Sequence, residues 1–415
     1  MDLLISHACP SCGGPVEIQE ADRLTSCVFC DVQNYMVNDG LLRYVLPDQV
    51  PEHIARENIV YFPYLRFKGN MFTCQGLELD TKVLDTTHRG LETELLPLSL
   101  GLRPQAMKVA LVNKSHTGLF LRRKDTAVKI LQRASLVEDT ISELNEQTLN
   151  HRAFIGESVS CIYLPLYIEN GMVYEGVLGR KLGRAESWLT DKQSTVRYQK
   201  EWEPSYLATI CPQCGASMQG ERDSLIMNCY NCDSCWAEKN GKFVPVPYTL
   251  LPAEKQESIQ LPFWRISVET TGINMRTFAD FLTATNQPVV VNWKHEEQNL
   301  EFWVPAMKLR PKIFLKLAKS ATLSQLTFSD GEKKLQKPLF PVTLPLKEAV
   351  QALKSIVAAT TVNKKDIMPQ LPTLTFEIKS TSLVLLPFED TGHDLIQEHS
   401  SLAVAASVVQ FGRKL

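Results

Sequence analysis

Eight of the eleven cysteines in this 415-residue chain fall into two sets with the same spacing. Both sets follow the pattern C-x2-C-x14-C-x2-C, the first at Cys9, Cys12, Cys27 and Cys30, the second at Cys211, Cys214, Cys229 and Cys232. Two cysteines separated by two residues can present both thiolates to one side of a metal ion, and two such pairs complete a tetrahedron. The sequence therefore predicts two metal sites, each with four thiolate ligands, and Zn2+ as the metal.

The chemistry of such sites is structural, because four thiolates leave no open position on the metal for water or substrate. His7 lies close in sequence to the first set, but the shell is complete without it. Cys235 follows Cys232 by a further two-residue gap. It is either a spare thiol near the metal, or a ligand that substitutes for Cys232 or exchanges with redox state. Disulfides are disfavoured, since paired C-x2-C units in a cytosolic chain are usually metal or redox sites.

Each cysteine set resembles the zinc ribbons, a widespread four-cysteine family with rubredoxin-like members. The first knuckle, Cys9-Pro10-Ser11-Cys12-Gly13, has the family's usual form, whereas the second ends in Cys30-Asp31 rather than Cys-Gly. That departure weakens the interpretation as an iron-binding, electron-transferring rubredoxin. The resemblance covers about thirty residues in each half. It implies two knuckles joined by short strands around a structural zinc ion, and no particular activity.

The segments that must position these cysteines recur along the chain. After each cysteine set, four short segments appear in the same order: residues 62–67 and 261–266, 102–104 and 309–311, 163–166 and 385–388, and 178–182 and 411–415. Each match is weak alone, but the ordered set is hard to explain by chance. We therefore expect a tandem duplication.

The expected fold class is α+β and β-rich: a tandem duplication of a zinc ribbon followed by a β-rich domain with one or two helices. The predicted boundaries are zinc ribbon 1 at 1–45, β-rich domain 1 at 46–183, a linker at 184–207, zinc ribbon 2 at 208–245 and β-rich domain 2 at 246–415.

Turn residues between apolar runs predict three hairpins. Asn170-Gly171 is a strong hairpin pattern, because both residues tolerate positive φ. Lys68-Gly69-Asn70 and Thr271-Gly272 indicate two more, one in each half.

Apolar residues at helical spacing predict a helix over 346–357. Pro104 suits the first position of a helix that continues to Leu111. Further helices are expected over 121–133 and over 137–148, the second behind a capping box at Ser135 and Glu138.

Two segments are strongly basic although the formal net charge of the chain is −2. Residues 103–133 contain eight Lys or Arg and one Asp, and residues 308–319 contain five Lys or Arg and no acid. The candidate anion- or partner-binding residues are Arg103, Lys108, Arg122, Arg123, Lys129, Lys308, Arg310, Lys312, Lys316 and Lys319. The last three share one face if the segment is helical. The favoured alternative is a solvated face whose charge is balanced elsewhere.

Aromatic residues just after each cysteine set have two interpretations. Tyr61, Tyr64, Phe263 and Trp264 could stack against nucleic-acid bases. Equally, they could form the core that seats each ribbon on its β-domain, with Arg66 and Arg265 paired to acids. Their position close to the ribbons favours the structural interpretation.

The sequence contains no nucleophile elbow, phosphate-binding P-loop, dinucleotide fingerprint or His-Glu-x-x-His motif. The N-terminal residues do not resemble a signal peptide, and no apolar run approaches the roughly 20 residues that span a bilayer, so we expect a soluble cytoplasmic protein. The leading hypothesis is a non-enzymatic zinc-binding adaptor or assembly component that acts through protein–protein interaction. The alternatives are a nucleic-acid-binding protein that uses the ribbons and the basic segments, and an enzyme with an unrecognised site between the halves.

Overall fold

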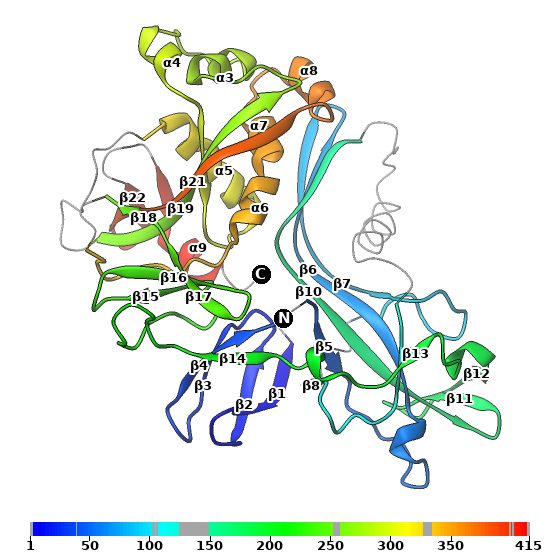
Figure 1. Cartoon of the computed structure of the whole chain (residues 1–415). Helices are drawn as coiled ribbons and strands as arrows, with labels where there is room; N and C mark the ends of the chain where they lie inside the picture. The colour runs from blue at the N-terminus through cyan, green and yellow to red at the C-terminus, as the bar shows by residue number, and fades with distance from the viewer. Residues whose placement is uncertain are drawn as a thin grey trace. The chain divides into compact units, whose positions relative to one another are not determined.

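The computed structural model of the chain describes residues 3–38, 40–101, 104, 107–123, 149–251, 258–326, 334–397, 400 and 402–412. It forms two compact units. Unit 1 comprises residues 1–68, 85–144 and 158–208, and unit 2 comprises residues 69–84, 145–157 and 209–415. Strands predominate in both, and the α-helices α3 to α9 lie between residues 278 and 411, so the expected β-rich α+β class is confirmed (Figure 1).

Unit 1 is built from strands and single turns of 3-10 helix. In chain order these are β1 Leu4–Ala8, β2 Pro15–Gln19, β3 Leu24–Ser26, β4 Gln33–Val37, β5 Leu42–Val45, η1 Arg56–Asn58, β6 Val60–Gln75, β7 Glu78–Arg89, β8 Lys108–Leu111, β9 Leu119–Leu121, β10 Leu149–Glu169, β11 Met172–Glu175, β12 Lys181–Arg184, η3 Ser187–Leu189, β13 Thr195–Val196, η4 Lys200–Trp202 and β14 Ser205–Ala208. By residue range, β6, β7 and β10 continue into unit 2.

Two sheets organise these strands. The large sheet has the order β13-β9-β6-β10-β5-β8-β1-β2, with β7 beside β6 and with β11 and β12 extending from β10. The small sheet has the order β14-β4-β3. The segment 184–207, expected as a linker, contributes η3, β13, η4 and most of β14.

The long central strand β6 is the main departure from the predicted hairpins. Lys68-Gly69-Asn70 is not a turn, because the chain runs straight through it, and the turn comes at Gly76, whose φ is 53°. Asn70 is buried, and its side-chain Nδ2 donates a hydrogen bond to the Leu309 carbonyl at 3.0 Å. Polar residues usually indicate an exposed turn, but Asn70 is buried and hydrogen-bonded inside the protein. This hairpin prediction was therefore wrong.

The hairpin at Asn170-Gly171 is confirmed. Strands β10 and β11 pair antiparallel, with Glu169 opposite Met172. Asn170 and Gly171 both have positive φ, 49° and 73°, as the two central residues of a type I′ turn require.

Pro104 is helical as predicted, but the helix does not continue to Leu111, since β8 is a strand that pairs with both β1 and β5. Its alternation of buried Val109 and Leu111 with less buried neighbours has the period of a strand. The helix over 121–133 is also not found where the structure describes the chain, because Leu119–Leu121 is strand β9. The rest of that segment from residue 124, and the helix over 137–148, lie outside the described residues.

Unit 2 contains a small sheet, a larger sheet and the helices. Its elements are β15 Ile226–Cys229, β16 Ser234–Lys239, β17 Lys242–Val246, β18 Tyr248–Leu250, β19 Ser258–Thr271, α3 Phe278–Ala284, α4 Trp293–Glu297, β20 Glu301–Pro305, α5 Pro311–Ser324, α6 Leu346–Gln351, α7 Leu353–Thr360, α8 Lys364–Ile367, η5 Met368–Gln370, β21 Thr375–Asp390, β22 Asp394–Gln397, β23 Ala403–Ala405 and α9 Ala406–Phe411. The small sheet has the order β15-β16-β17 and the larger one β20-β19-β21-β22-β23, with β18 beside β21.

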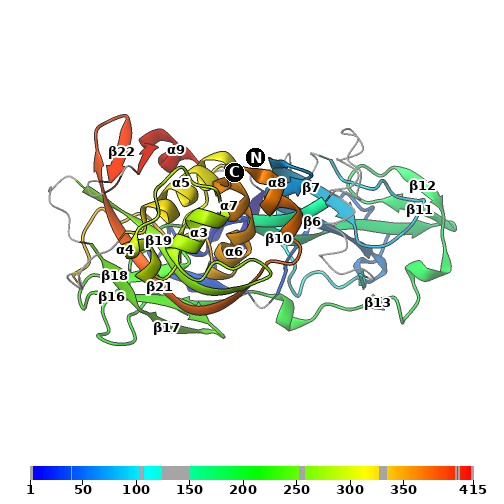
Figure 2. The same cartoon turned by 90° about the horizontal axis from the view of Figure 1, so that it is seen from above.

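Helix α5 packs against β20 and β23 of the larger sheet, α6 packs against β19, and both contact α7 (Figure 2). The helix predicted over 346–357 is confirmed as α6 and α7, whose buried faces include Ala349, Leu353 and Ile356. The hairpin predicted at Thr271-Gly272 is wrong, because the chain leaves β19 there and enters α3. A capping box between Thr277 and Asp280 begins that helix. Among the described residues, no helix combines the length and apolar character needed to cross a membrane.

A buried ion pair lies at the centre of unit 1. Arg66 of β6 is 1% exposed, and its Nε donates to Glu20 Oε2 at 2.8 Å. A second carboxylate, Asp85, lies 3.0 Å from Arg66 Nη1, and Ser160 of β10 donates to the other oxygen of Glu20. The predicted pairing of Arg66 with acids is therefore confirmed, and it ties the turn after β2 to β6, β7 and β10.

Replacing Arg66 by Met should destabilise the protein by about 3–5 kcal/mol, because the buried Glu20 carboxylate loses its counter-charge. The matched control is Arg265→Met. Arg265 lies 3.3 Å from Glu301, but both side chains are partly exposed, so its loss should cost only about 1 kcal/mol. Urea unfolding followed by circular dichroism measures both. Equal losses of unfolding free energy in the two variants would show that burial does not determine how much such an ion pair stabilises the protein.

The His151 side chain makes the stability of unit 2 depend on pH. Burial, together with the charge of Lys354, lowers the pKa of His151 to about 4, and its Nε2 has no hydrogen-bond partner among the described residues. The unfolded chain takes up this proton near pH 6.5 and the folded chain only near pH 4, so the unfolded state binds more protons in between. Stability contributed by neutral His151 is therefore complete above pH 6.5 and is lost as the pH falls towards 4.

We expect the His151→Gln variant to lose less stability than the parent between pH 7 and pH 5. His393→Gln, which replaces an exposed histidine, should follow the parent curve. Urea midpoints at each pH measure the difference, and other pH-sensitive groups cancel in the comparison. A parallel decline in all three proteins would remove the assignment to His151.

Candidate metal centres

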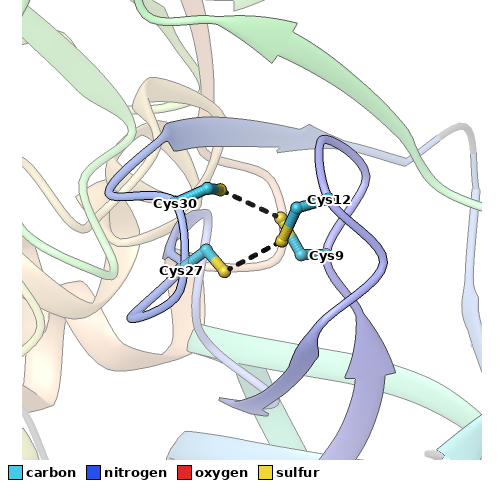
Figure 3. Close-up of side chains that lie close together, drawn as sticks. All are labelled: Cys9, Cys12, Cys27 and Cys30. Atoms are coloured by element: carbon cyan, nitrogen blue, oxygen red, sulfur yellow. Dashed lines mark hydrogen bonds between the residues drawn. The ribbon is translucent and has the colours of Figure 1, made fainter.

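The first four-cysteine group is carried on two turns of unit 1. Cys9 and Cys12 lie between β1 and β2, and Cys27 and Cys30 lie between β3 and β4. In the first turn the Cys9 N–H donates to the Gly14 carbonyl and the Gly13 N–H donates to the Cys9 carbonyl, both at 2.8 Å. These bonds close the turn, and both thiols then point to one side of it (Figure 3).

The second turn explains the departure from the usual family pattern. Asp31 replaces the glycine expected after Cys30 and has φ of 52°, in the left-handed region. Aspartate tolerates this conformation better than most residues. The second site has Asp233 at the matching position, with φ of 50°, so the substitution preserves the turn in both ribbons.

The sulfur atoms of the first group are spaced for a tetrahedral metal. The Cys12 and Cys27 sulfurs are 3.6 Å apart and the Cys9 and Cys30 sulfurs 3.8 Å apart. All four lie within 4.8 Å of one another. A tetrahedron with zinc–sulfur bonds of about 2.3 Å has sulfur–sulfur edges of roughly 3.8 Å. The donor set and its spacing therefore fit a metal ion held by four thiolates.

The second group repeats this arrangement in unit 2. The Cys214 and Cys229 sulfurs are 3.5 Å apart and the Cys211 and Cys232 sulfurs 3.6 Å apart. Again all four ligand atoms lie within 4.8 Å of one another. In each group the first and third cysteines are buried and the second is exposed. The sequence thus placed both groups correctly, and the identity of the metal stays a prediction.

Cys235 does not join the second group. Its side chain is buried in the core of unit 2 and its thiol donates to Asn228 Oδ1 at 3.3 Å. Burial raises the pKa of Cys235 to about 12, so this thiol stays protonated and is a poor ligand. The arrangement matches the interpretation of Cys235 as a spare thiol near the metal.

Hydrogen-bond donors favour ionised sulfur at Cys9 in the first group and at Cys214 in the second, whereas the pKa of Cys30 and that of Cys232 are raised to about 12. The N–H groups of Cys12 and Ser11 lower the pKa of Cys9 to about 6. The Asn231 side chain and the Ala216 N–H lower the pKa of Cys214 to about 6. Hydrogen bonds from N–H to ligand sulfur are typical of the outer shell of thiolate metal sites. A cation at the centre of each group would stabilise the remaining thiols as thiolates.

His7 is not part of the first group. Its ring stacks on Tyr206 with 5.4 Å between centroids, and its Nε2 contacts the Tyr206 hydroxyl. The four thiols form the group without it.

The second knuckle of ribbon 1 also carries an exposed apolar tip that sequence reasoning passed over. Val28 is 83% exposed, Phe29 65% and Val32 40%. In ribbon 2 the corresponding knuckle has Tyr230 and Asn231, and Tyr230 is covered by Lys337 Nζ at 4.3 Å from the ring centroid. The sequence pattern that could have identified this exposed tip is the pair of apolar residues between Cys27 and Cys30.

The described candidate basic residues belong to both units, three to unit 1 and five to unit 2. Lys108 on β8 makes an ion pair with Glu17, while Arg122 and Arg123 are exposed just after β9. The other described members lie on or just before α5, where Arg310, Lys312 and Lys316 are exposed and Lys308 and Lys319 are half-buried. The helical face predicted for this segment is confirmed, with Pro311 at its first position. Arg103 and Lys129 lie outside the described residues.

The aromatic residues after each ribbon are core residues. Tyr61, Tyr64, Phe263 and Trp264 are all less than 9% exposed. Buried rings cannot receive a base, so the structural interpretation of these segments is confirmed.

Comparison with known proteins returned no match: no protein-family model, no curated protein and no solved structure is similar to this chain.

Metal analysis of the purified protein should return two zinc ions per chain. Cys27→Ser should lower this to one, because three ligands hold zinc far more weakly than four. Cys235→Ser should retain two, since that thiol is outside the group. Iron accompanied by visible absorbance would overturn the zinc assignment, and loss of zinc from Cys235→Ser would overturn the ligand set.

Proposed function

We propose that the chain is a tandem duplication of a zinc ribbon followed by a β-rich domain. The support comes from strand pairing within each unit. In unit 1, β5 pairs parallel with β10, and in unit 2, β18 pairs parallel with β21. Strands β11 and β12 extend from β10 as β22 and β23 extend from β21. The recurring segments 163–166 and 385–388 lie in the equivalent strands β10 and β21.

Single hydrogen bonds repeat with this pairing. The Leu46 N–H donates to the Tyr163 carbonyl at 3.0 Å, and the Leu251 N–H donates to the Leu385 carbonyl at 3.0 Å. Under the proposed alignment Leu46 corresponds to Leu251 and Tyr163 to Leu385. The turns that carry Cys9 and Cys211 also correspond, because each is closed by a hydrogen bond from the cysteine N–H to the carbonyl five residues later.

Within this frame, we propose that both metal sites hold structural Zn2+ and that the protein is a non-enzymatic adaptor or assembly component. Four thiolates complete each shell, so neither metal has a position at which a substrate could bind. The exposed knuckle tip of ribbon 1 carries the adaptor proposal. Val28, Phe29 and Val32 form an apolar patch at the end of a turn that a metal would hold rigid. Such a patch fits an apolar groove on a protein partner.

The state of the thiols favours a reducing compartment, which we propose to be the cytoplasm. All eleven cysteines are free, and Cys74, Cys161 and Cys235 are buried outside the metal groups. A chain that kept these three cysteines as thiols would be unusual in an oxidising compartment.

Affinity purification of the tagged protein from cells that express it tests the adaptor proposal. A protein partner should co-purify with the parent and survive nuclease treatment. The double variant Val28→Ser/Phe29→Ser should reduce its recovery at least about tenfold, the loss expected for apolar hot-spot residues. Leu178→Ser, which removes an exposed leucine elsewhere in unit 1, is the matched control. Equal recovery with both variants would exclude the knuckle tip as the binding surface.

Nucleic-acid binding is the second candidate, favoured by the basic face of α5. Lys312 and Lys316 are exposed at i and i+4, with Lys319 at the next turn. If this face binds phosphates, the affinity for single-stranded oligonucleotide should fall steeply between 50 and 200 mM salt, and Lys312→Gln/Lys316→Gln should reduce that salt slope by roughly two. Fluorescence anisotropy measures both. Absent or salt-insensitive binding removes this candidate.

A further inference from the structure

Unit 1 contains an arginine-lined cavity that the metal sites and the knuckle tip do not use. Its volume is about 300 Å3, and its polar lining includes Arg43, Arg122, Arg123 and Gln199. Apolar side chains complete the wall, among them Leu41, Leu121 and Val196. Pockets of about this size and character are at the small end of ligand-binding sites.

Two of the arginines are positioned by neighbouring groups. The Arg43 guanidinium lies over the Trp202 ring, 4.9 Å from its centroid, and its Nη1 donates to the Leu41 carbonyl at 3.1 Å. Arg122 Nε donates to the Thr195 carbonyl at 3.4 Å. Contacts to an aromatic face and to carbonyls orient the guanidinium groups without cancelling their charge.

Within the part of the chain that the structure describes, no carboxylate balances these charges. None of the described residues that line the cavity is acidic, and no ion pair joins Arg43, Arg122 or Arg123 to any residue that the structure describes. Like charges that share a cavity repel one another, and an anion with several oxygens removes that repulsion. The cavity therefore has a strong preference for a multiply charged anion.

The floor of the cavity belongs to strand β10. Cys161 and Tyr163 are buried there, and burial raises the pKa of Cys161 to about 11 and that of Tyr163 well above its usual value. Both groups are thus neutral at physiological pH. The Tyr163 hydroxyl can donate a hydrogen bond to an anion, and neither side chain adds negative charge.

The matching positions of unit 2 lack these features. Arg43 pairs with Cys161 in the sheet of unit 1, and Tyr248 pairs with Leu383 at the corresponding place in unit 2. Tyr163 likewise corresponds to the buried Leu385. If the shared strand arrangement required these residues for folding, unit 2 would have them as well. Arg43, Cys161 and Tyr163 therefore serve a purpose that is particular to unit 1.

We propose that this cavity binds a small phosphate monoester, with the phosphate among the three arginines and an apolar or aromatic group against Leu41, Leu121 and Val196. Arginine forks match phosphate oxygens and can bind them in pairs. A dianionic monoester also satisfies more of the threefold positive charge than a carboxylate does. Free inorganic phosphate shares the charge but leaves the apolar wall uncovered, so it should bind more weakly.

Isothermal titration calorimetry on the full zinc-loaded chain tests this site with phenyl phosphate and inorganic phosphate as probes. Phenyl phosphate should bind saturably at one site per chain, and inorganic phosphate more weakly. Arg122→Gln and Arg123→Gln remove exposed side chains, so they should leave the fold intact. Each should weaken phenyl phosphate roughly 10- to 100-fold, the expected loss for a hydrogen bond to a charged group.

Arg180→Gln is the matched control, because it removes the same charge from an exposed position of unit 1 outside the cavity. Its affinity for phenyl phosphate should equal that of the parent. Three results would overturn the proposal: no saturable binding of either probe, equal losses in the Arg180 and Arg122 variants, or binding of a short single-stranded oligonucleotide without binding of phenyl phosphate. The last result would assign the cavity to a nucleic-acid surface.

Discussion

Four sulfur atoms within 4.8 Å of one another impose the constraint on which each ribbon depends. Such a group is stable as thiolates only around a cation, because the like charges otherwise repel. In unit 1 the two knuckles belong to different sheets: Cys9 and Cys12 follow β1 of the large sheet, while Cys27 and Cys30 follow β3 of the small one. A metal at this point would join the two sheets, in addition to the contact between His7 of β1 and Tyr206 of β14. The ribbon contributes only a few buried apolar residues, such as Ile18, Leu24 and Met36.

The second constraint is electrostatic and acts on one unit more than the other. Under the proposed duplication, Arg66 of β6 corresponds to Arg265 of β19. The first is buried among Glu20, Asp85 and Ser160, while the second is partly exposed beside Glu301. Desolvating a charge costs several kcal/mol unless partners are fixed around it. The buried cluster therefore fixes the register of four chain segments, since moving any of them would leave a buried charge unpaired. The partly exposed pair of Arg265 and Glu301 can exchange its contact for contacts with water, so it does little to fix the strand register.

How much of this could be predicted depends on the range of the interactions involved. Cysteine spacing, the Asn170-Gly171 turn and the apolar stripe of α6 and α7 are local patterns, and the sequence predicts them correctly. Lys68-Gly69-Asn70 fails as a turn because Asn70 finds its partner at Leu309, far along the chain. Likewise, the sequence of β8 by itself predicts a helix, because its strand conformation depends on pairing with β1 and β5, which are distant in the chain. The cavity could not be predicted, since it combines Arg43 with Arg122 and Trp202 from three distant segments.

Under the proposed duplication, the differences between the halves are more informative about function than the features they share. The shared features (thiolate groups, knuckle turns and the central strand pairing) are those that folding requires of each copy. Two of these differences lie in unit 1: a knuckle tip left uncovered where Tyr230 is covered by Lys337, and Arg43 with Cys161 where unit 2 has Tyr248 with Leu383. An exposed phenylalanine carries a free-energy cost in a protein that binds nothing, and so do arginines that have no ion-pair partner among the described residues. Both features lie in unit 1 and support the two binding proposals made for it, while unit 2 has exposed apolar residues of its own at Val290, Trp293 and Phe411.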